Sequence, residues 1–472
     1  MGRRDRRRHE SARLNGETAL PARAFTADGL SRRLAAFVRN ASWEEVPQTV
    51  RAYATKAIFN GVGTALGGCS DKAIVRLAET LAAFSAGETA TVIGRRGRRD
   101  ALTAAFLNAA AMNVFDFDDT HIRTILHPTA PIAPVVLALA QAQPTSGSRA
   151  LHAFILGVEV ACRIGLAVSP SHYERGWHIT STCGVFGAAV AAAKLLDLNE
   201  EQILWALGNA SAQASGLVET LGFMAKSVGV GNAARGGLLS ALMARTGVEG
   251  PPRPLEGERG FLAVSCDAPD PERIEHKLGS EWEILLDMFK PYPCGVVLNP
   301  VIDACLAARA APTFCVERIA EVVVRGNPLL KARADRPHVA TGREAQVSAQ
   351  HAISVCLLRG SAGVAEFNDA AVNDAEVRAL SAKVRRVEID ETTPIEAARV
   401  SIRFSDGSAQ DQIVEAATGS LARPMTDEAL QQKFAALARY GCPDFDAAPL
   451  AAKLWDLAGA ADVGAVAALA GG

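Results

Sequence analysis

The chain has 472 residues, with 49 lysines and arginines against 51 aspartates and glutamates, so its formal net charge is −2. Such near-neutrality offers no electrostatic case for binding nucleic acid or an anionic membrane surface. Hydrophobic residues make up 49% and charged residues 21%, which excludes disorder as the main state. Aromatic residues make up only 6%, so a core built from Ala, Leu and Val is expected, which favours packed helices over a β-sandwich.

The N-terminal residues 1–27 are rich in arginine, and no apolar stretch of signal-peptide length follows the arginines. They are interpreted as a disordered tail or as the product of a start codon assigned too early, with a nucleic-acid-binding arm as the alternative. Apolar runs elsewhere, such as 183–196, are too short and too rich in Ala and Gly to span a bilayer. Ordered structure without a membrane span is therefore expected from residue 28.

Apolar residues recur at helical spacing up to about residue 246, which predicts an all-helical domain over 28–289. A short strand or turn is expected at 91–94. Asp197 and Asn199 are expected to end one helix and to cap the next. The predicted helical runs are 28–85, 100–114, 131–143, 149–168, 183–195, 199–216 and 232–246.

The pattern changes after the proline-rich loop 251–260. Alternating runs predict strands at 317–325, 384–389, 398–404 and 408–415, with Ser405-Asp406-Gly407 as a turn and a helix at 343–358. Thr426 is the expected N-cap of an amphipathic helix, and the C-terminal residues are helical again. The expected fold is mostly α, with a smaller α+β domain at 290–423 and a helical return at 424–472. The cleft between the two domains is the expected site.

The nine cysteines are scattered, and none stands in a CxxC pair. This pattern argues against a disulfide framework and against a structural zinc site. A reducing, cytoplasmic location is therefore expected. The positions are Cys69, Cys162, Cys183, Cys266, Cys294, Cys305, Cys315, Cys356 and Cys442.

The segment DFDDTHIRTILHP at 116–128 holds three carboxylates and two imidazoles that could serve as acid, base or metal ligands. Its spacing matches no established metal motif. The alternative is a solvated turn whose aspartates cap the neighbouring helices. The candidate residues are Asp116, Asp118, Asp119, Thr120, His121, Arg123 and His127.

Two further segments could bind an anion. GWHITSTCG at 176–184 places His178 and Ser181 beside a helix N-terminus, although a capping run with a packed histidine would look the same. GFMAKSVGVGNAARGG at 222–237 places Lys226 in an apolar, glycine-rich stretch where it could bind a carboxylate. The glycines could let the backbone approach a ligand or could allow close helix packing, and the segment is not a P-loop.

The segment KPYPCGVVLNPVIDA at 290–304 begins the α+β domain, and its two prolines predict a rigid, extended hinge. Cys294 could be a nucleophile, but no His–Asn partner motif surrounds it, so a structural role is preferred. The chain contains no Rossmann fingerprint, nucleophile elbow, HExxH motif or kinase signature, which removes support for the commonest cofactor-dependent classes.

These four segments, in this order, resemble the MmgE/PrpD family, which includes 2-methylcitrate dehydratase, cis-aconitate decarboxylase and iminodisuccinate epimerase. The segments ALGNASAQASGL, TGREAQVSAQHAIS and RPMTDEALQQKF also match the family, and the resemblance covers about residues 28–460. It implies a helical domain with an α+β lid of chorismate-mutase-like topology, a homodimer, and no cofactor or metal.

The resemblance also implies functional residues. Three positions depart from the family pattern: Gly229 and Asn299 stand where many members have His, and His351 stands where many have Tyr. Asn299 can hydrogen-bond a carboxylate but cannot act as an acid near neutral pH, whereas His351 can titrate there. The expected catalytic residues are Asp116, Thr120, His127, His178, Lys226 and His351, and the expected substrate-binding residues are Arg123, Ser181, Lys290 and Asn299.

The family's chemistry centres on a carbon next to a carboxylate, where removal of a proton leaves a carbanion that needs cations and hydrogen-bond donors. His127, oriented by Asp116, is expected to be one acid–base partner, and His351 or another residue of the α+β domain the other. The first hypothesis is a hydro-lyase that dehydrates a 2-methylcitrate-like tricarboxylate. The alternatives are an epimerase of a dicarboxylate such as iminodisuccinate, a cis-aconitate-type decarboxylase, and a non-catalytic carboxylate-binding protein.

Overall fold

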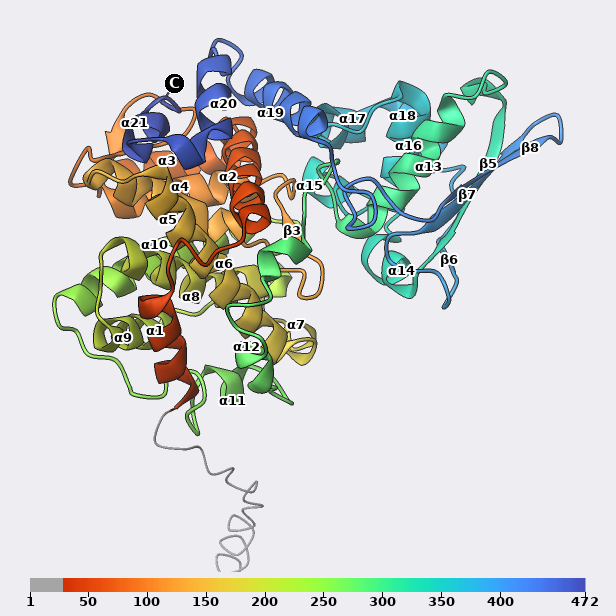
Figure 1. Ribbon diagram of the computed structural model, residues 1–472. Coiled ribbons are helices and arrows are strands. Elements are labelled where there is room, and N and C mark those ends of the chain that lie inside the picture. The colour runs from red at the N-terminus through yellow and green to blue at the C-terminus, as the bar shows by residue number, and fades with distance from the viewer. Residues whose placement is uncertain (1–28, 472) are drawn as a thin grey trace, which may run out of the picture.

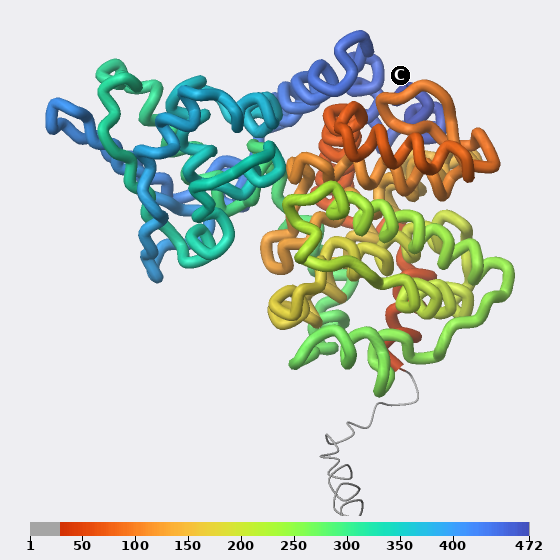
Figure 2. Tube along the Cα trace, turned by 180° about the vertical axis from the view of Figure 1, so that it is seen from behind, coloured from red at the N-terminus to blue at the C-terminus, as the bar shows by residue number. Residues whose placement is uncertain are grey.

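Alanine-rich helices pack into the larger of two domains, and a four-stranded sheet with its own helices forms the smaller (Figure 1). The computed structural model describes residues 29–471, so the arginine-rich segment 1–27 lies outside the described residues. The view from behind also shows the two domains side by side, with the C-terminal segment returning to the helical domain (Figure 2).

The helical domain contains a first series of helices and a C-terminal series that packs against it. One hydrophobic core runs through both series, from Leu30 to Phe289 and from Leu430 to Ala470. The helices are α1 (Leu30–Asn40), α2 (Gln48–Gly68), α3 (Lys72–Ala82), α4 (Ala101–Asn113), α5 (Thr129–Ala142), α6 (Gly147–Val168), α7 (Ser171–Glu174), α8 (Ile179–Leu195), α9 (Glu200–Ser211), α10 (Ala225–Arg245), α11 (Phe261–Ser265), α12 (Glu272–Glu275), α19 (Asp427–Gly441), α20 (Ala448–Trp455) and α21 (Val463–Ala468).

Two short antiparallel ribbons accompany these helices. β1 (Ala90–Thr91) pairs with β2 (Arg98–Arg99), and β3 (Thr120–His121) pairs with β4 (Asp287–Met288). The second ribbon brings the candidate segment 116–128 beside the chain that enters the α+β domain. Short 3₁₀ helices lie at Val218–Thr220, Glu283–Leu286, Val296–Leu298, Val316–Arg318, Val364–Phe367 and Leu457–Gly459.

The α+β domain has a separate core, which runs from Cys294 to Phe404. Its sheet has the order β6-β5-β7-β8, with β5 parallel to β6 and antiparallel to β7, and with a β7–β8 hairpin. The strands are β5 (Ile319–Gly326), β6 (Glu388–Ile389), β7 (Ala398–Phe404) and β8 (Ala409–Val414), and the helices are α13 (Asn299–Arg309), α14 (Pro328–Ala334), α15 (Gly342–Ala345), α16 (Ala349–Arg359), α17 (Asp369–Asn373) and α18 (Ala375–Ser381).

Several local predictions are confirmed. The Asn199 side chain caps α9 in a capping box, and the Thr426 side chain accepts a hydrogen bond from the Ala429 N–H at the start of α19. Gly407 adopts φ 85° in the turn between β7 and β8, a left-handed conformation that glycine accepts without strain.

Other predictions need correction. The helix expected at 343–358 is two helices: α15 ends at Ala345, and the Ser348 side chain caps the start of α16. The strand expected at 384–389 pairs regularly only at Glu388–Ile389. The helix expected at 199–216 ends at Ser211.

Helix α6 is the one helix in the described part of the chain that is long and apolar enough to cross a bilayer, but its most apolar window is fully buried inside the domain. It also carries an ion pair between the buried side chains of Glu159 and Arg163, with Arg163 Nε 2.6 Å from Glu159 Oε1. Arg163 donates further hydrogen bonds to the carbonyls of His276 and Glu281. Helix α6 is thus a core helix tied to the chain that leads to β4.

Four glycines of the segment 222–237, namely Gly229, Gly231, Gly236 and Gly237, lie against other protein atoms. α10 begins at Ala225 and packs on α8, and a Cβ atom at Gly237 would lie 2.4 Å from Ala188 Cβ and 2.7 Å from the Val185 carbonyl oxygen. A Cβ atom at Gly231 would lie 2.8 Å from the Phe106 carbonyl oxygen. Of the two interpretations of these glycines, close helix packing is the one the geometry supports.

We therefore expect Gly237→Ala to lower the free energy of unfolding by about 1–3 kcal/mol, because the added methyl group forces α8 and α10 apart. The matched control is Gly236→Ala, whose Cβ would first meet the Gln213 side chain at 3.2 Å. Gly236→Ala should lower the free energy of unfolding by about 1 kcal/mol or less, because the flexible Gln213 side chain can move and alanine favours the helix. Urea denaturation of both variants tests this, and equal losses would contradict it.

Candidate active site

A cavity of about 300 Å³ lies where the two domains meet. The helical domain contributes the acid, base and hydroxyl groups, and the α+β domain contributes three arginines. Its polar and aromatic lining residues include Asp116, Thr120, His127, Tyr173, His178, Lys226, Lys290, Arg333, Arg336 and Arg343.

Asp116 is the central charged group of this cavity. It follows the C-terminal end of α4 and adopts φ 54°, a left-handed conformation that aspartate tolerates better than most residues. Its Oδ1 lies 2.5 Å from Lys226 Nζ, on α10, and its Oδ2 lies 2.9 Å from Lys290 Nζ, which also donates to the Asp116 carbonyl. One carboxylate therefore holds two ammonium groups from distant segments.

This arrangement keeps Asp116 ionised. Burial opposes ionisation, but the positive charges of Lys226 and Lys290 outweigh it and hold the pKa of Asp116 well below its usual value. The side chain of Lys290 is only 2% exposed and that of Asp116 16% exposed, so water screens these interactions weakly.

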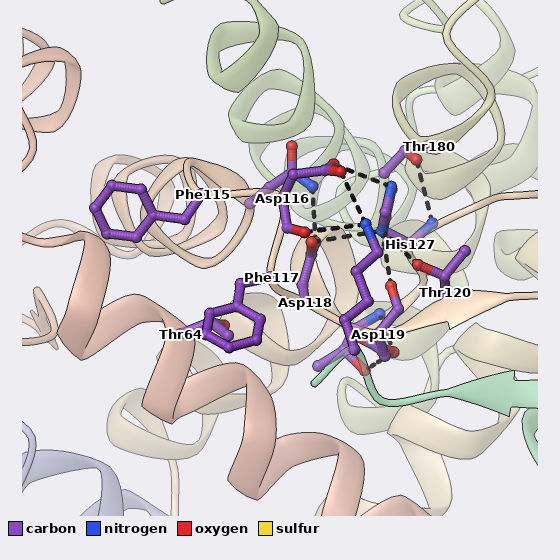
Figure 3. Close-up of polar contacts among 12 residues, drawn as sticks. Thr64, Phe115, Asp116, Phe117, Asp118, Asp119, Thr120, His127 and Thr180 are labelled. Atoms are coloured by element: carbon purple, nitrogen blue, oxygen red, sulfur yellow. Dashed lines mark hydrogen bonds and ion pairs between the residues drawn. The ribbon is translucent and has the colours of Figure 1, made fainter. Parts of the chain in front are cut away.

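His127 lies next to Asp116, with Nε2 3.6 Å from Asp116 Oδ1 (Figure 3). Its Nδ1 is 2.7 Å from the Asp119 carbonyl oxygen and 3.2 Å from Thr120 Oγ1. A carbonyl only accepts hydrogen bonds, so Nδ1 must donate its proton there and Nε2 carries the free electron pair. Burial lowers the pKa of His127 below its ordinary value, which leaves the ring neutral near pH 7.

His178 is a second neutral imidazole beside the cavity. Its Nδ1 is 2.8 Å from Ser181 Oγ in the first turn of α8. Burial, followed by the charge of Lys226, lowers the pKa of His178 to about 3. Ser181 thus contacts His178 and lies behind it, and is not itself among the residues that line the cavity.

A buried acidic layer supports His127 from behind. The Asp119 carboxylate accepts a hydrogen bond from Thr129 Oγ1, at the start of α5, and lies near the buried carboxyl group of Asp287 of β4. Burial raises the pKa of both carboxyl groups; the charge of Asp118 adds to this at Asp119, and that of Asp119 adds to it at Asp287. The backbone carbonyl of Asp119 accepts the hydrogen bond that orients His127.

Lys433, on α19, lies near these buried carboxyl groups. Its ammonium group donates to the Phe117 carbonyl at 2.7 Å and to the Lys290 carbonyl at 2.8 Å. Burial holds the pKa of Lys433 well below its usual value. The sequence pattern does not single out Lys433, because this residue lies on an amphipathic helix rich in polar residues, where a lysine normally faces solvent.

The structure does not bring all the expected residues to the cavity. Arg123 is 48% exposed and lies near Glu283. Asn299 lies in a separate hollow, with Oδ1 4.0 Å from Cys294 Sγ. His351 is buried in the α+β domain, where Nε2 is 2.7 Å from the Glu366 carbonyl oxygen, so its expected place in the site is corrected.

Cys294 and Gly229 are packed against other protein atoms. Burial raises the pKa of the Cys294 thiol, which disfavours a nucleophilic thiolate. Gly229 lies against Ser181, whose Oγ would be 2.7 Å from an added Cβ atom.

The arginines of the α+β domain are site residues that sequence reasoning missed. Arg333, on α14, stacks over the Tyr173 ring of the helical domain, with 5.3 Å between the guanidinium carbon and the ring centroid. Arg343 is paired with Asp71, with Nη2 2.6 Å from Oδ1. The Arg336 side chain is exposed and has no ion pair within residues 29–471. The basic segment KARADRP at 331–337, which contains Arg333 and Arg336, could have indicated a cationic site from the sequence.

One group of side chains has the chemistry to bind a metal ion. Ligand atoms of Asp116, Asp118 and His127 lie within 4.8 Å of one another. Asp116 already neutralises two ammonium groups, so a cation would compete there with Lys226 and Lys290.

A helical domain and an α+β domain with a cationic, histidine-containing cavity between them characterise this protein. The model of the MmgE/PrpD N-terminal domain matches residues 32–274, and that of the MmgE/PrpD C-terminal domain matches residues 292–456. The chain therefore belongs to the MmgE/PrpD family.

Curated relatives include the cis-aconitate decarboxylase of Homo sapiens, which is 30% identical over 375 residues, or 75% of this chain and 76% of the relative. The cis-aconitate decarboxylase of Mus musculus is 29% identical over 81% of each chain. That of Aspergillus terreus is 28% identical over 87% of this chain and 89% of the relative.

Because Asp116 is the counter-charge for two buried lysines, we expect Asp116→Asn to lower the free energy of unfolding by about 3–5 kcal/mol. Citrate should restore stability to this variant more than to the wild type, since its carboxylates replace the missing charge. Urea denaturation with and without citrate measures both effects.

The control is Asp411→Asn, which removes a partner of Arg399 on the exposed face of the β7–β8 hairpin. That change should cost about 1 kcal/mol or less, because solvent screens an exposed pair. Equal losses in the two variants, or no effect of citrate, would show that Asp116 does not organise the cationic pocket.

Proposed function

We propose that this protein is a lyase that removes a proton next to a carboxylate of a tricarboxylate and then eliminates water, with a 2-methylcitrate-like substrate as the first choice. The observation that carries the proposal is His127, a neutral base whose free Nε2 lies beside Asp116 and two ammonium groups. Retention of Asp116, His178 and Lys226 around it weighs against a non-catalytic carboxylate-binding protein.

The charge of the cavity supports a polycarboxylate substrate. Lys226, Lys290, Arg333, Arg336 and Arg343 contribute five positive charges, and Asp116 contributes one negative charge. Asp116 and Asp71, which pair with cations of this group, offset part of this charge, and the remaining excess creates a positive potential in the cavity that attracts polyanions. The cations come from both domains, so a substrate with several carboxylates would contact both of them.

In the proposed reaction, His127 Nε2 takes the proton from the carbon next to a carboxylate. Lys226 and Lys290 lie where they would stabilise the negative charge that develops on that carboxylate. The electron pair then forms the double bond as the β-hydroxyl group leaves. Lys226, whose ammonium group pairs with Asp116 in the cavity, would donate a proton to the departing hydroxide, and Thr120 would bind a substrate oxygen.

Decarboxylation of cis-aconitate is the second candidate, and the three decarboxylases among the relatives favour it. A carbanion would then arise by loss of CO₂ from cis-aconitate and would take up a proton. Dehydration begins with removal of a proton, a step suited to neutral imidazoles, whereas decarboxylation needs no such base, which is why dehydration stands first. As part of the proposal, the family resemblance and the scattered cysteines support a cytoplasmic homodimer.

Incubation with 2-methylcitrate, citrate, cis-aconitate and iminodisuccinate in D₂O, followed by NMR, tests the proposal. We expect a new alkene signal from 2-methylcitrate or a close analogue, with no release of CO₂. Loss of CO₂ from cis-aconitate would establish the second candidate instead. Exchange of the α-proton without net loss of substrate would indicate an epimerase, and tight binding without any change would indicate a binding protein.

The pH profile tests His127 as the base. Because burial lowers its pKa from the ordinary 6.5, the ring stays neutral as the pH falls through 6.5 and becomes protonated only at lower pH. We therefore expect kcat/KM to stay level near pH 6.5 and to fall in more acidic buffers. Replacement of the base, His127→Gln, should lower kcat by about 10²–10⁴-fold.

The matched control is His152→Gln, at a buried histidine of α6 that does not line the cavity. This variant should keep the wild-type rate and pH profile. An acid limb well above pH 6.5, or a His127→Gln enzyme with an unchanged rate, would rule out His127 as the base.

A further inference from the structure

Two cysteines from distant parts of the chain meet at the ends of two packed helices. Cys69 directly follows α2 and Cys442 directly follows α19, and their Sγ atoms are 3.0 Å apart. All nine cysteines are free thiols within residues 29–471, and this is the one pair among them whose sulfur atoms are in contact. The pair lies outside the active-site cavity.

The surrounding backbone holds the two sulfur atoms together. Gly94 adopts φ 69°, and a Cβ atom there would lie 2.6 Å from the sulfur of Cys69 and 2.7 Å from that of Cys442. A Cβ atom at Gly441 would collide with the Leu66 carbonyl oxygen, so the two helix ends approach each other backbone to backbone. A disulfide has an S–S distance of about 2.05 Å, so the sulfur atoms need to approach by only about 1 Å.

The two thiols are not equivalent. Cys69 is 2% exposed, whereas Cys442 is partly exposed. The hydrogen bond between the two thiols lowers the pKa of Cys442, and the Arg95 guanidinium, which donates a 3.0 Å hydrogen bond to the Cys69 carbonyl, acts in the same direction. The same hydrogen bond raises the pKa of Cys69. Cys442 is therefore the thiolate that reacts, and Cys69 is the thiol that resolves.

We propose that Cys69 and Cys442 are a peroxide-sensitive thiol pair that closes into a reversible disulfide. The Cys442 thiolate attacks one oxygen of hydrogen peroxide, the O–O bond breaks, and a sulfenic acid and a hydroxide ion form; the hydroxide takes up the proton that the Cys442 thiol had released and becomes water. The Cys69 sulfur then attacks the Cys442 sulfur, the S–O bond breaks, and the second water leaves with the Cys69 proton. The two thiols lose two electrons, which reduce the peroxide.

The disulfide fastens the C-terminal return to the first part of the helical domain. It joins positions 373 residues apart in the chain, and α19 also carries Lys433, which holds the Phe117 and Lys290 carbonyls next to the site. A cross-link over so long a segment restricts the unfolded chain strongly. The oxidised protein is therefore expected to melt at a higher temperature than the reduced protein.

The test is to treat the reduced full-length protein with hydrogen peroxide and to count its thiols with Ellman's reagent in denaturant. We expect the number to fall from nine to seven, and dithiothreitol to restore it. Peptide mapping without reductant should give one intramolecular link, between the peptides that contain Cys69 and Cys442. The oxidised protein should show the higher melting temperature.

The variant Cys442→Ser should retain its remaining eight thiols under the same treatment, whereas the control Cys315→Ser, at the other partly exposed cysteine, should still form the link. Sulfinic acid at Cys442 without a link, links between chains, links to other cysteines, or nine unchanged thiols would each overturn the proposal. If Cys442→Ser fails to fold, the wild-type peptide map alone decides.

Discussion

The carboxylate of Asp116, held between the ammonium groups of Lys226 and Lys290, is the interaction on which the site depends. It joins the segment after α4, the start of α10 and the entrance to the α+β domain. None of these charges would be stable alone in so buried a place, because desolvation penalises each of them. The cluster therefore fixes three distant segments in one position and, in doing so, places the base His127 beside two cations.

Much of the surrounding structure serves to keep this cluster in place. Thr129 donates a hydrogen bond to Asp119, whose carbonyl orients His127, while Lys433 holds the carbonyls of Phe117 and Lys290. The helical domain supplies a rigid acid–base wall, and the α+β domain supplies arginines that face it.

The sequence predicted local features well where short-range physics decides them. Asn199 and Thr426 cap their helices as expected, and the β7–β8 hairpin turns at 405–407. It also placed Asp116, Thr120, His127, His178 and Lys226 in one site, although that inference came from the family resemblance. It failed for His351 and Asn299, which face other parts of the α+β domain, and it missed Lys433 and the arginines near 333–343.

What the sequence determined by itself is therefore the alanine-rich helical class, the division into a helical and an α+β domain, and the segments that carry reactive groups. These follow from composition, periodicity and capping, which act over a few residues. Only the tertiary structure decided which side chains meet, such as Cys69 with Cys442, and which titratable groups have a shifted pKa. Burial and charge pairing arise between segments hundreds of residues apart, and no local pattern records them.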